Sequence, residues 1–134
     1  MKPVHDLFKA METNDSTLAA SVFTEDAVLY TVFTDKSGQV QKRSSPVSAL
    51  TSAFGKPKEQ TWTEPIWNEQ VLISGELASV WVDYAFYIDK SFSHCGVDAF
   101  HLIKMESGWK IFHLADTRQK DGCKIPKDVQ KAYE

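Results

Sequence analysis

Two aspartates, Asp98 and Asp116, are the residues of this chain best suited to acid–base chemistry. Both lie in the apolar-rich segment 92–118, which reads as two strands joined at Glu106-Ser107-Gly108. In the three-residue hairpin that this glycine favours, Asp98 lies directly opposite Asp116. Side chains opposed in this way have Cβ atoms about 5 Å apart. Two carboxyl groups this close cannot both ionise cheaply, so one would hold a raised pKa and could act as an acid.

The same face of the predicted hairpin carries an apolar floor and two more polar side chains. Phe100 and Leu114 lie on one side of the aspartates, and Arg118 and His94 lie on the other. Alternate residues of a strand share a face, so all of them would line one wall. A wholly polar face is typical of a solvated sheet and a wholly apolar face of a core. The mixture therefore predicts the wall of a pocket.

We take Asp98, Asp116 and His94 as candidate catalytic residues. Two alternatives stay open. Arg118 can instead neutralise one aspartate in a structural ion-pair network, which also perturbs pKa values. A two-residue loop would shift the hairpin register by one residue and turn Asp116 to the other face.

Aromatic residues on other strands are candidates for stacking on a planar ligand. Aromatic side chains on strands also belong to cores, so simple packing is the alternative. The predicted ligand-binding set is Trp67, Tyr84, Tyr30, Phe100, Leu114 and Arg118.

Two histidines, His101 and His113, face each other on the opposite side of the predicted hairpin. Zinc sites have three or four protein ligands, and the sequence offers no evident third ligand here, so we expect no metal site. We expect the two histidines to belong to a dimer interface. Cys95 beside His94 is not a nucleophile–base pair, because adjacent strand residues point to opposite faces. Motifs for phosphate loops, serine nucleophiles and metalloproteases are missing, and no cofactor is predicted.

The bulk properties indicate one globular domain. The 134 residues, 43% hydrophobic and 25% charged, suffice for a single core. A net charge of -3 and a pI near 5.8 are not typical of a protein that binds nucleic acid through a basic surface. No apolar run has membrane-spanning length, and the charged N-terminal segment does not resemble a signal peptide. We therefore expect a cytoplasmic protein in which Cys95 and Cys123 are reduced.

Two short helices are predicted at the N-terminus. Apolar residues recur at helical spacing from Val4, with Pro3 in the first turn, and the first helix would end near Asn14. Asp15 is a good N-cap for the second helix, and segment 24–26 would close the pair.

A strand, a polar strand and a third helix follow. Residues 27–33 are β-branched and aromatic, and residues 39–43 can return as a short polar strand. The third helix would begin at 44–45 and end at Gly55, followed by Pro57.

The second half of the chain reads as long strands. Residues 61–74 and 77–89 are joined by a two-residue turn at Gly75-Glu76. Pairing across this turn sets Trp67 opposite Tyr84.

Helices first and long antiparallel strands last favour an α+β fold in one domain, 1–134. Long strands twist strongly, so we expect a curved sheet whose concave face is covered by the helices. Residues 119–134 would form a charged, extended tail with one helical turn at most. The apolar convex face would need a partner, which predicts a homodimer through it. Its expected members are Trp81, Tyr87, Ile103, Trp109 and Ile111.

Two runs resemble the NTF2-like superfamily. VHDLFKAMETNDSTLAASVFTEDAVL resembles its opening helix pair, and SHCGVDAFHLIKMESGWKIFHLADT resembles its closing hairpin. The second run is most similar to the branch known as "putative lumazine-binding" proteins. The resemblance extends from about Val4 to Arg118 and implies a cone of curved antiparallel sheet. The superfamily includes isomerases, dehydratases, cyclases, epoxide hydrolases and transport adaptors, so the fold alone names no activity.

Ketosteroid isomerase allows one comparison by residue. Its protonated aspartate lies in a strand pattern similar to that around Asp98, while its catalytic base would fall near Thr31 and its tyrosine near Phe8. The base and the tyrosine are therefore missing. We predict a small-molecule-binding protein that takes an apolar or aromatic molecule. The alternatives are a lyase or isomerase with Asp98 as the acid, and a noncatalytic dimerisation or adaptor domain.

Overall fold

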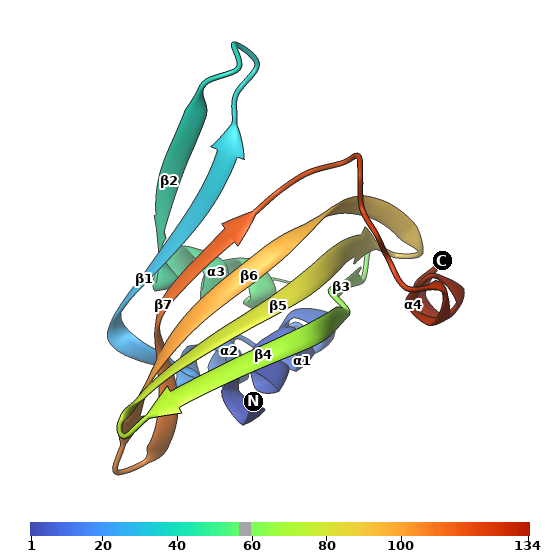
Figure 1. The fold of residues 1–134 in the computed structure, drawn as a ribbon. Coiled ribbons are helices and arrows are strands. Elements are labelled where there is room, and N and C mark those ends of the chain that lie inside the picture. The colour runs from blue at the N-terminus through green and yellow to red at the C-terminus, as the bar shows by residue number, and fades with distance from the viewer. Residues whose placement is uncertain (57–59) are drawn as a thin grey trace.

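A curved sheet, antiparallel except for the parallel pair β1–β7, forms the body of the molecule with three helices on one face (Figure 1). The computed structural model describes residues 1–56 and 60–134. Its seven-stranded sheet has the order β2-β1-β7-β6-β5-β3, and β4 also pairs with β5. This confirms the α+β class. The elements are α1 (Lys2–Thr13), α2 (Ser16–Ser21), β1 (Phe23–Thr34), β2 (Val40–Pro46), α3 (Val47–Gly55), β3 (Trp62–Thr63), β4 (Ile66–Ser74), β5 (Leu77–Ile88), β6 (Ser91–Met105), β7 (Gly108–Thr117) and α4 (Lys127–Tyr133).

The N-terminal helices form as their sequence predicts. α1 has proline in its first turn and ends at Asn14, whose left-handed backbone (φ 56°) stops it. The Asp15 side chain accepts a hydrogen bond from the Leu18 amide and caps α2. Segment 24–26 belongs to β1, so the expectation that it closes the helix pair is wrong. The Ile111 amide of β7 already donates to the carbonyl just before β1, and this starts the strand at Phe23.

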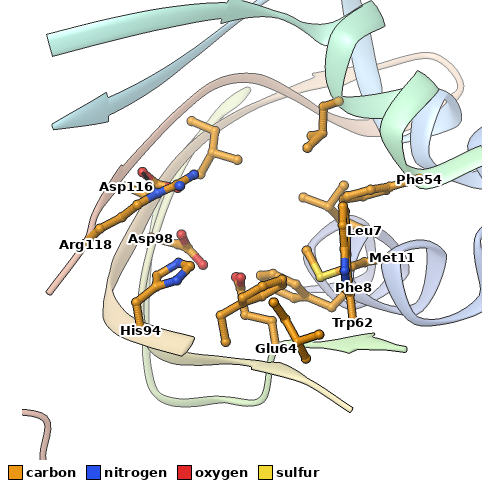
Figure 2. A pocket seen from close by; sticks show the side chains of 14 residues that line it. Leu7, Phe8, Met11, Phe54, Trp62, Glu64, His94, Asp98, Asp116 and Arg118 are labelled. Atoms are coloured by element: carbon orange, nitrogen blue, oxygen red, sulfur yellow. Dashed lines mark ion pairs between the residues drawn. The ribbon is translucent and has the colours of Figure 1, made fainter. Parts of the chain in front are cut away.

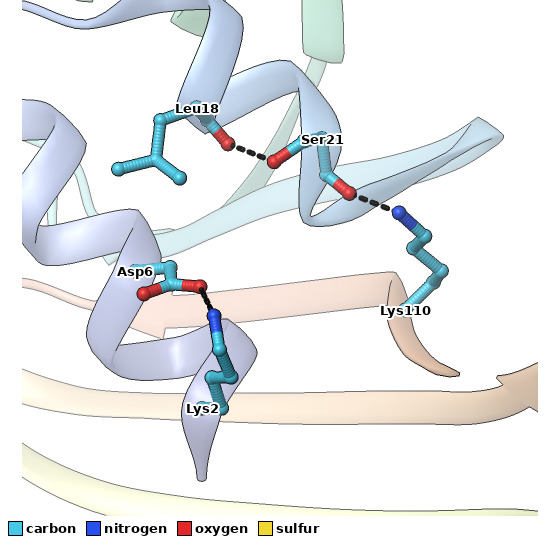
Figure 3. Close-up of polar contacts among 5 residues, drawn as sticks. All are labelled: Lys2, Asp6, Leu18, Ser21 and Lys110. Atoms are coloured by element: carbon cyan, nitrogen blue, oxygen red, sulfur yellow. Dashed lines mark hydrogen bonds and ion pairs between the residues drawn. The ribbon is translucent and has the colours of Figure 1, made fainter. Parts of the chain in front are cut away.

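Polar contacts at the end of α2 attach this helix to the sheet (Figure 3). The Ser21 hydroxyl donates to the Leu18 carbonyl at 2.7 Å, and Lys110 Nζ donates to the Ser21 carbonyl. The exposed ion pair between Lys2 and Asp6, at 2.6 Å, joins successive turns of α1. Of these contacts, that of Lys110 joins the end of α2 to β7.

The third helix also differs slightly from its prediction. α3 begins at Val47, after Pro46, and packs closely on α2: a Cβ added to Gly55 would lie 2.7 Å from Ser16 Cβ. Pro57, expected to end the helix, lies outside the described residues. The polar strand is longer than predicted and fully exposed.

The closing hairpin β6–β7 has the predicted register around Asp98 and Asp116 and a different register next to its turn. Met105 pairs with Gly108, not with Trp109, because the turn has two residues. A bulge beside Phe112 then restores the register, so that Asp98 lies opposite Asp116. The bulge also turns Trp109 and Ile111 inward against the core, and their predicted place on the convex face is wrong.

The β4–β5 hairpin contains a second irregularity. Ser74 pairs with Leu77 as predicted, but a bulge at Asn68 (φ 55°) shifts the pairing. Trp67 therefore lies opposite Asp83, and the predicted pairing of Trp67 with Tyr84 is wrong. The strand expected over 61–74 is interrupted between β3 and β4.

The C-terminal segment is fastened to the sheet. Cys95 and Cys123 form a disulfide, so the expectation of two reduced thiols is wrong. The chain returns alongside β6 after β7, where Cys95 and Gln119 exchange backbone hydrogen bonds, and this brings the two cysteines together. The segment ends in α4, whose Tyr133 stacks on Tyr87. Tyr87 is fully buried and is no part of an open convex face.

The convex face that remains open carries Trp81, 50% exposed, and Ile103, 38% exposed. In the described part of the chain, no helix combines the length and apolarity needed to cross a membrane.

Candidate functional site

A cavity of about 310 Å³ opens between the helices and the concave face of the sheet (Figure 2). α1 and α3 contribute an apolar roof that includes Leu7, Met11 and Phe54. Trp62 and Phe86 form a T-shaped pair at the side, with ring centroids 6.0 Å apart. The volume is within the range of small-ligand sites, which are mostly apolar with a few convergent polar groups.

The facing aspartates of the hairpin form the polar end of this cavity. Asp98 is 3% exposed and is the buried charged residue of the core. Asp98 Oδ2 and Asp116 Oδ1 are both buried without a hydrogen-bond partner among the described residues. Buried polar atoms in native proteins are almost always paired, so these two acceptor oxygens lack the donor that such a site normally holds.

Glu64, which the sequence analysis missed, completes the acidic end. It lies at the break between β3 and β4, and its carboxyl group points toward Asp98 (Figure 2). Pro65 follows it, and a proline inside a strand pattern marks an edge or an interruption. The sequence thus held a signal for the break, although none for the direction of the Glu64 side chain.

The ionisation of Glu64 and the ionisation of Asp98 affect each other. Burial raises the pKa of Glu64 well above its ordinary value, and the charge of Asp98 and its hydrogen bond to Asp98 raise it further. Burial raises the pKa of Asp98 to about 7, although accepting that hydrogen bond works in the opposite direction. Two buried carboxyl groups whose ionisations affect each other do not ionise together easily, so the pair keeps at least one proton near neutral pH.

Asp116 has a partial counter-charge. Arg118 Nε lies 3.9 Å from Asp116 Oδ1, and the arginine side chain is 54% exposed at the rim. Burial raises the pKa of Asp116, while a hydrogen bond from Thr31 and the charge of Arg118 lower it. Thr31 is the strand neighbour of Asp116 in the parallel pair β1–β7.

His94 lines the cavity beside Asp98. Its ring lies 5.1 Å from that of Phe86 and meets Tyr84 edge-on at 5.7 Å. Burial lowers its pKa to about 4, with help from the charges of Arg118 and Lys120. The imidazole is therefore neutral at pH 7 and does not offset the carboxylates.

The structure brings part of the predicted ligand-binding set together. Leu114 and Arg118 line the cavity with the two aspartates and His94. Tyr84 lies behind the acidic end, where its hydroxyl donates to the Thr117 carbonyl at 2.6 Å. Phe100 is packed in the core, edge-on to Phe8.

Two of the predicted residues lie elsewhere. The Tyr30 ring packs against His113 and beneath Lys42 Nζ, which is 4.7 Å from its centroid. Trp67 lines a separate hollow of about 200 Å³ beside the disulfide. Within residues 1–56 and 60–134, no group of three or more His, Cys, Asp or Glu side chains is arranged to hold a metal ion.

The cone of curved sheet, the helical roof and the enclosed cavity define an NTF2-like protein. The chain belongs to the family described as "Putative lumazine-binding", whose pattern it matches over residues 1–114. No curated protein matches it.

Solved structures similar to this chain show the same fold at low identity. An NTF2-like protein of unknown function from Shewanella baltica is 17% identical, with 90% of each chain covered and a TM-score of 0.64. A protein of unknown function from Mycobacterium tuberculosis is 15% identical, covering 98% of this chain and 82% of the other, with a TM-score of 0.69. An NTF2-like "putative dehydratase" from Streptomyces avermitilis is 14% identical, covering 88% and 91%, with a TM-score of 0.64.

Proposed function

We propose that this protein binds a small apolar or aromatic molecule in the cavity between α1, α3 and the sheet, with the polar end of the ligand at Asp98. The observation that carries the proposal is a buried carboxylate oxygen, Asp98 Oδ2, which faces an apolar cavity and has no partner among the described residues. Family membership supports small-molecule binding, and the cavity volume of about 310 Å³ suits a compact ligand.

Thermal-shift screening with aromatic and apolar metabolites tests this proposal. A ligand that binds only the folded state raises the midpoint of unfolding, and the rise grows with the logarithm of the ligand concentration once this exceeds Kd. Two variants locate the site: Met11→Trp fills the apolar end, and Asp98→Asn removes the charge at the polar end. We expect neither variant to show the ligand-induced rise in the unfolding midpoint. His101→Asn, on the opposite face of the hairpin, should still show it. A shift that survives Met11→Trp would place the ligand outside the cavity.

Catalysis is the second candidate function, and one observation favours it. Glu64 and Asp98, whose pKa values are both raised by burial, line the cavity beside a neutral His94, an arrangement that can donate a proton to a bound ligand and accept one from it. In this proposal Asp98 is the acid, and His94 or Asp116 is the base. A pH–rate profile on a ligand that is turned over tests it, and equal rates in wild type and Asp98→Asn would remove Asp98 from the mechanism.

A homodimer through the convex face is part of the proposal. Support comes from Trp81 and Ile103, which are large apolar side chains exposed on that face. Sedimentation of wild type and Trp81→Asp tests it, and a monomeric wild type would overturn it. If dimerisation is the function, no compound will shift the unfolding midpoint and Trp81→Asp will destabilise the chain.

The sequence predicts a cytoplasmic location, whereas the disulfide favours an oxidising compartment, because cytosolic thiols are kept reduced. Trapping of free thiols in freshly lysed cells distinguishes the two. Alkylation of Cys95 and Cys123 in the native host supports the cytoplasm, and their protection supports the oxidising compartment.

A further inference from the structure

The polar end of the cavity consists mainly of hydrogen-bond acceptors. Asp98 Oδ2 and Asp116 Oδ1 come from neighbouring strands, line the same cavity and are both buried without a partner among the described residues. An ionised carboxylate is acceptor-only. A ligand that satisfies both oxygens must therefore bring at least two donors.

Negative charge exceeds positive charge at this end. The carboxyl groups of Glu64, Asp98 and Asp116 converge there, while the positive charge among the cavity-lining residues is that of Arg118. That guanidinium is 54% exposed, and its Nε lies 3.9 Å from Asp116, so solvent screens the pair. Even with one proton held by the Glu64–Asp98 pair, no residue of 1–56 or 60–134 forms an ion pair with Asp98.

Among the described residues, the other elements add no cation to the lining of this cavity, and Lys120, which follows β7, acts on the neighbouring His94 through its charge. α1 and α3 contribute apolar lining residues, β1 contributes the Thr31 hydroxyl, and β5 contributes Tyr84, whose hydroxyl is already bonded to a backbone carbonyl. His94 from β6 is neutral. A buried, unpaired carboxylate is costly, and a cation from the ligand would offset that cost.

We infer that the cavity selects small aromatic molecules bearing a protonated nitrogen with two or more N–H donors, such as a primary ammonium or an amidinium. The inference rests on the proposed function and names its ligand class. The N–H donors would meet Asp98 Oδ2 and Asp116 Oδ1, while the aromatic body lies among the rings of Phe8, Trp62 and Phe86. Aromatic faces also attract cations, so the apolar walls do not oppose the charge.

This ligand class makes binding depend on pH in one direction. A cation beside Asp98 favours the ionised carboxylate, so binding releases a proton while free Asp98 is partly protonated. Affinity for an ammonium ligand should therefore rise as pH increases from about 5.5 to about 8 and then level off, as Asp98 titrates near pH 7. A neutral or anionic ligand of the same shape would not gain affinity over this interval.

Isothermal titration with a set of matched probes tests the inference. 1-Naphthylmethylamine, 1-naphthylmethanol and 1-naphthoate share one ring system and present a cation, a neutral hydroxyl and an anion. At pH 8 we expect the amine to bind at least about tenfold more tightly than the alcohol, as expected for a charged hydrogen bond. Naphthoate should bind weakest. The advantage of the amine should shrink as the pH falls to 5.5.

Two variants that each remove one negative charge provide the control. Asp98→Asn removes it inside the cavity and Glu76→Gln removes it at the exposed β4–β5 turn. We expect the advantage of the amine to vanish in Asp98→Asn and to persist in Glu76→Gln. If Asp98→Asn does not fold, the pH dependence of the wild type still decides.

The outcomes separate this inference from the proposed function. Equal binding of all three probes, with loss in Met11→Trp, overturns the cation preference and leaves the cavity as a ligand site. Tighter binding of naphthoate or the alcohol overturns the cation preference too, as does an equal effect of the two charge variants. If none of the three binds, the cation inference is overturned, and the metabolite screen with Met11→Trp judges the proposed function.

Discussion

Two pairs of titratable residues face each other across the same hairpin with opposite consequences. Asp98 pairs with Asp116 and, three positions along, His101 pairs with His113. The aspartates point into the cavity, where Asp98 is 3% exposed. The histidine rings stack 5.2 Å apart on the other face, where both residues are half-buried. Strand alternation alone separates the two pairs.

The comparison shows that surroundings decide what a facing pair can do. Burial raises the pKa of both aspartates, and one carboxylate oxygen of each is buried without a hydrogen-bond partner among the described residues. Burial and the neighbouring His101 lower the pKa of His113, and the two rings stack. The two facing aspartates inside the cavity remain available to bind the hydrogen-bond donors of a ligand. The two facing histidines on the other face relieve their repulsion by releasing a proton.

Removal of the disulfide should have the largest effect on stability. The loss of local stability should be greater near the aspartate pair than near the histidine pair. Cys95 lies shortly before Asp98 on β6, at a sequence separation of 28 from Cys123. Replacing both cysteines with alanine should lower the unfolding free energy by about 3–4 kcal/mol. Urea unfolding measures the loss. Amide exchange should accelerate more at Val97 and Thr117 than at His101.

Wild type in excess reductant is the matched condition and should reproduce the double variant. An unfolding free energy within about 0.5 kcal/mol of the oxidised protein would mean that packing of α4 alone holds the segment. Equal acceleration of exchange at both pairs would contradict the claim that the disulfide fixes the acidic end.

Asp98→Asn should have the next largest effect, through pH. The folded state keeps a proton on Asp98 up to about pH 7, whereas the unfolded chain loses it near pH 4. The folded state therefore binds more protons in this interval, and stability falls as pH rises through it. The wild type should lose about 3–4 kcal/mol more than Asp98→Asn between pH 4 and pH 8, as measured by urea unfolding at each pH.

Glu76→Gln, an exposed carboxyl in the turn, should keep the wild-type pH dependence. If Asp98→Asn and wild type show parallel profiles, Asp98 is not the group that holds the proton, and Glu64→Gln becomes the variant to test.

Much of the fold follows from local signals in the sequence. The apolar spacing and the Asp15 cap give α1 and α2, and the turn at Gly75-Glu76 gives the register next to it. The alternation of the closing hairpin brought Asp98 and Asp116 together correctly although the turn length was wrong. A two-residue turn and a bulge beside Phe112 shift the register in opposite senses and cancel.

The remaining errors concern contacts between residues distant in sequence. Glu64 enters the site because Pro65 breaks a strand, and nothing local states where the side chain then points. The pairing of Cys95 with Cys123 depends on the return of the chain after β7. The bulge at Asn68 places Trp67 opposite Asp83 and not opposite Tyr84. A one-residue shift changes the partner and the face of the residues on the far side of the bulge from the turn.

Substitution of the histidine pair should give the smallest effect. Folded His113 has a lowered pKa, so the unfolded chain binds more protons and stability rises with pH through the range where unfolded histidine titrates, near 6.5. Because both rings are partly exposed, His113→Gln should change the unfolding free energy by less than about 0.5 kcal/mol at any pH between 5 and 8.

The affinity of the cavity for a ligand should stay the same, since the two pairs point to opposite faces. His101→Gln is the reciprocal control and should act alike. A tenfold change in ligand affinity in either variant would mean that the two faces of the hairpin are coupled, and the contrast between the pairs would fail.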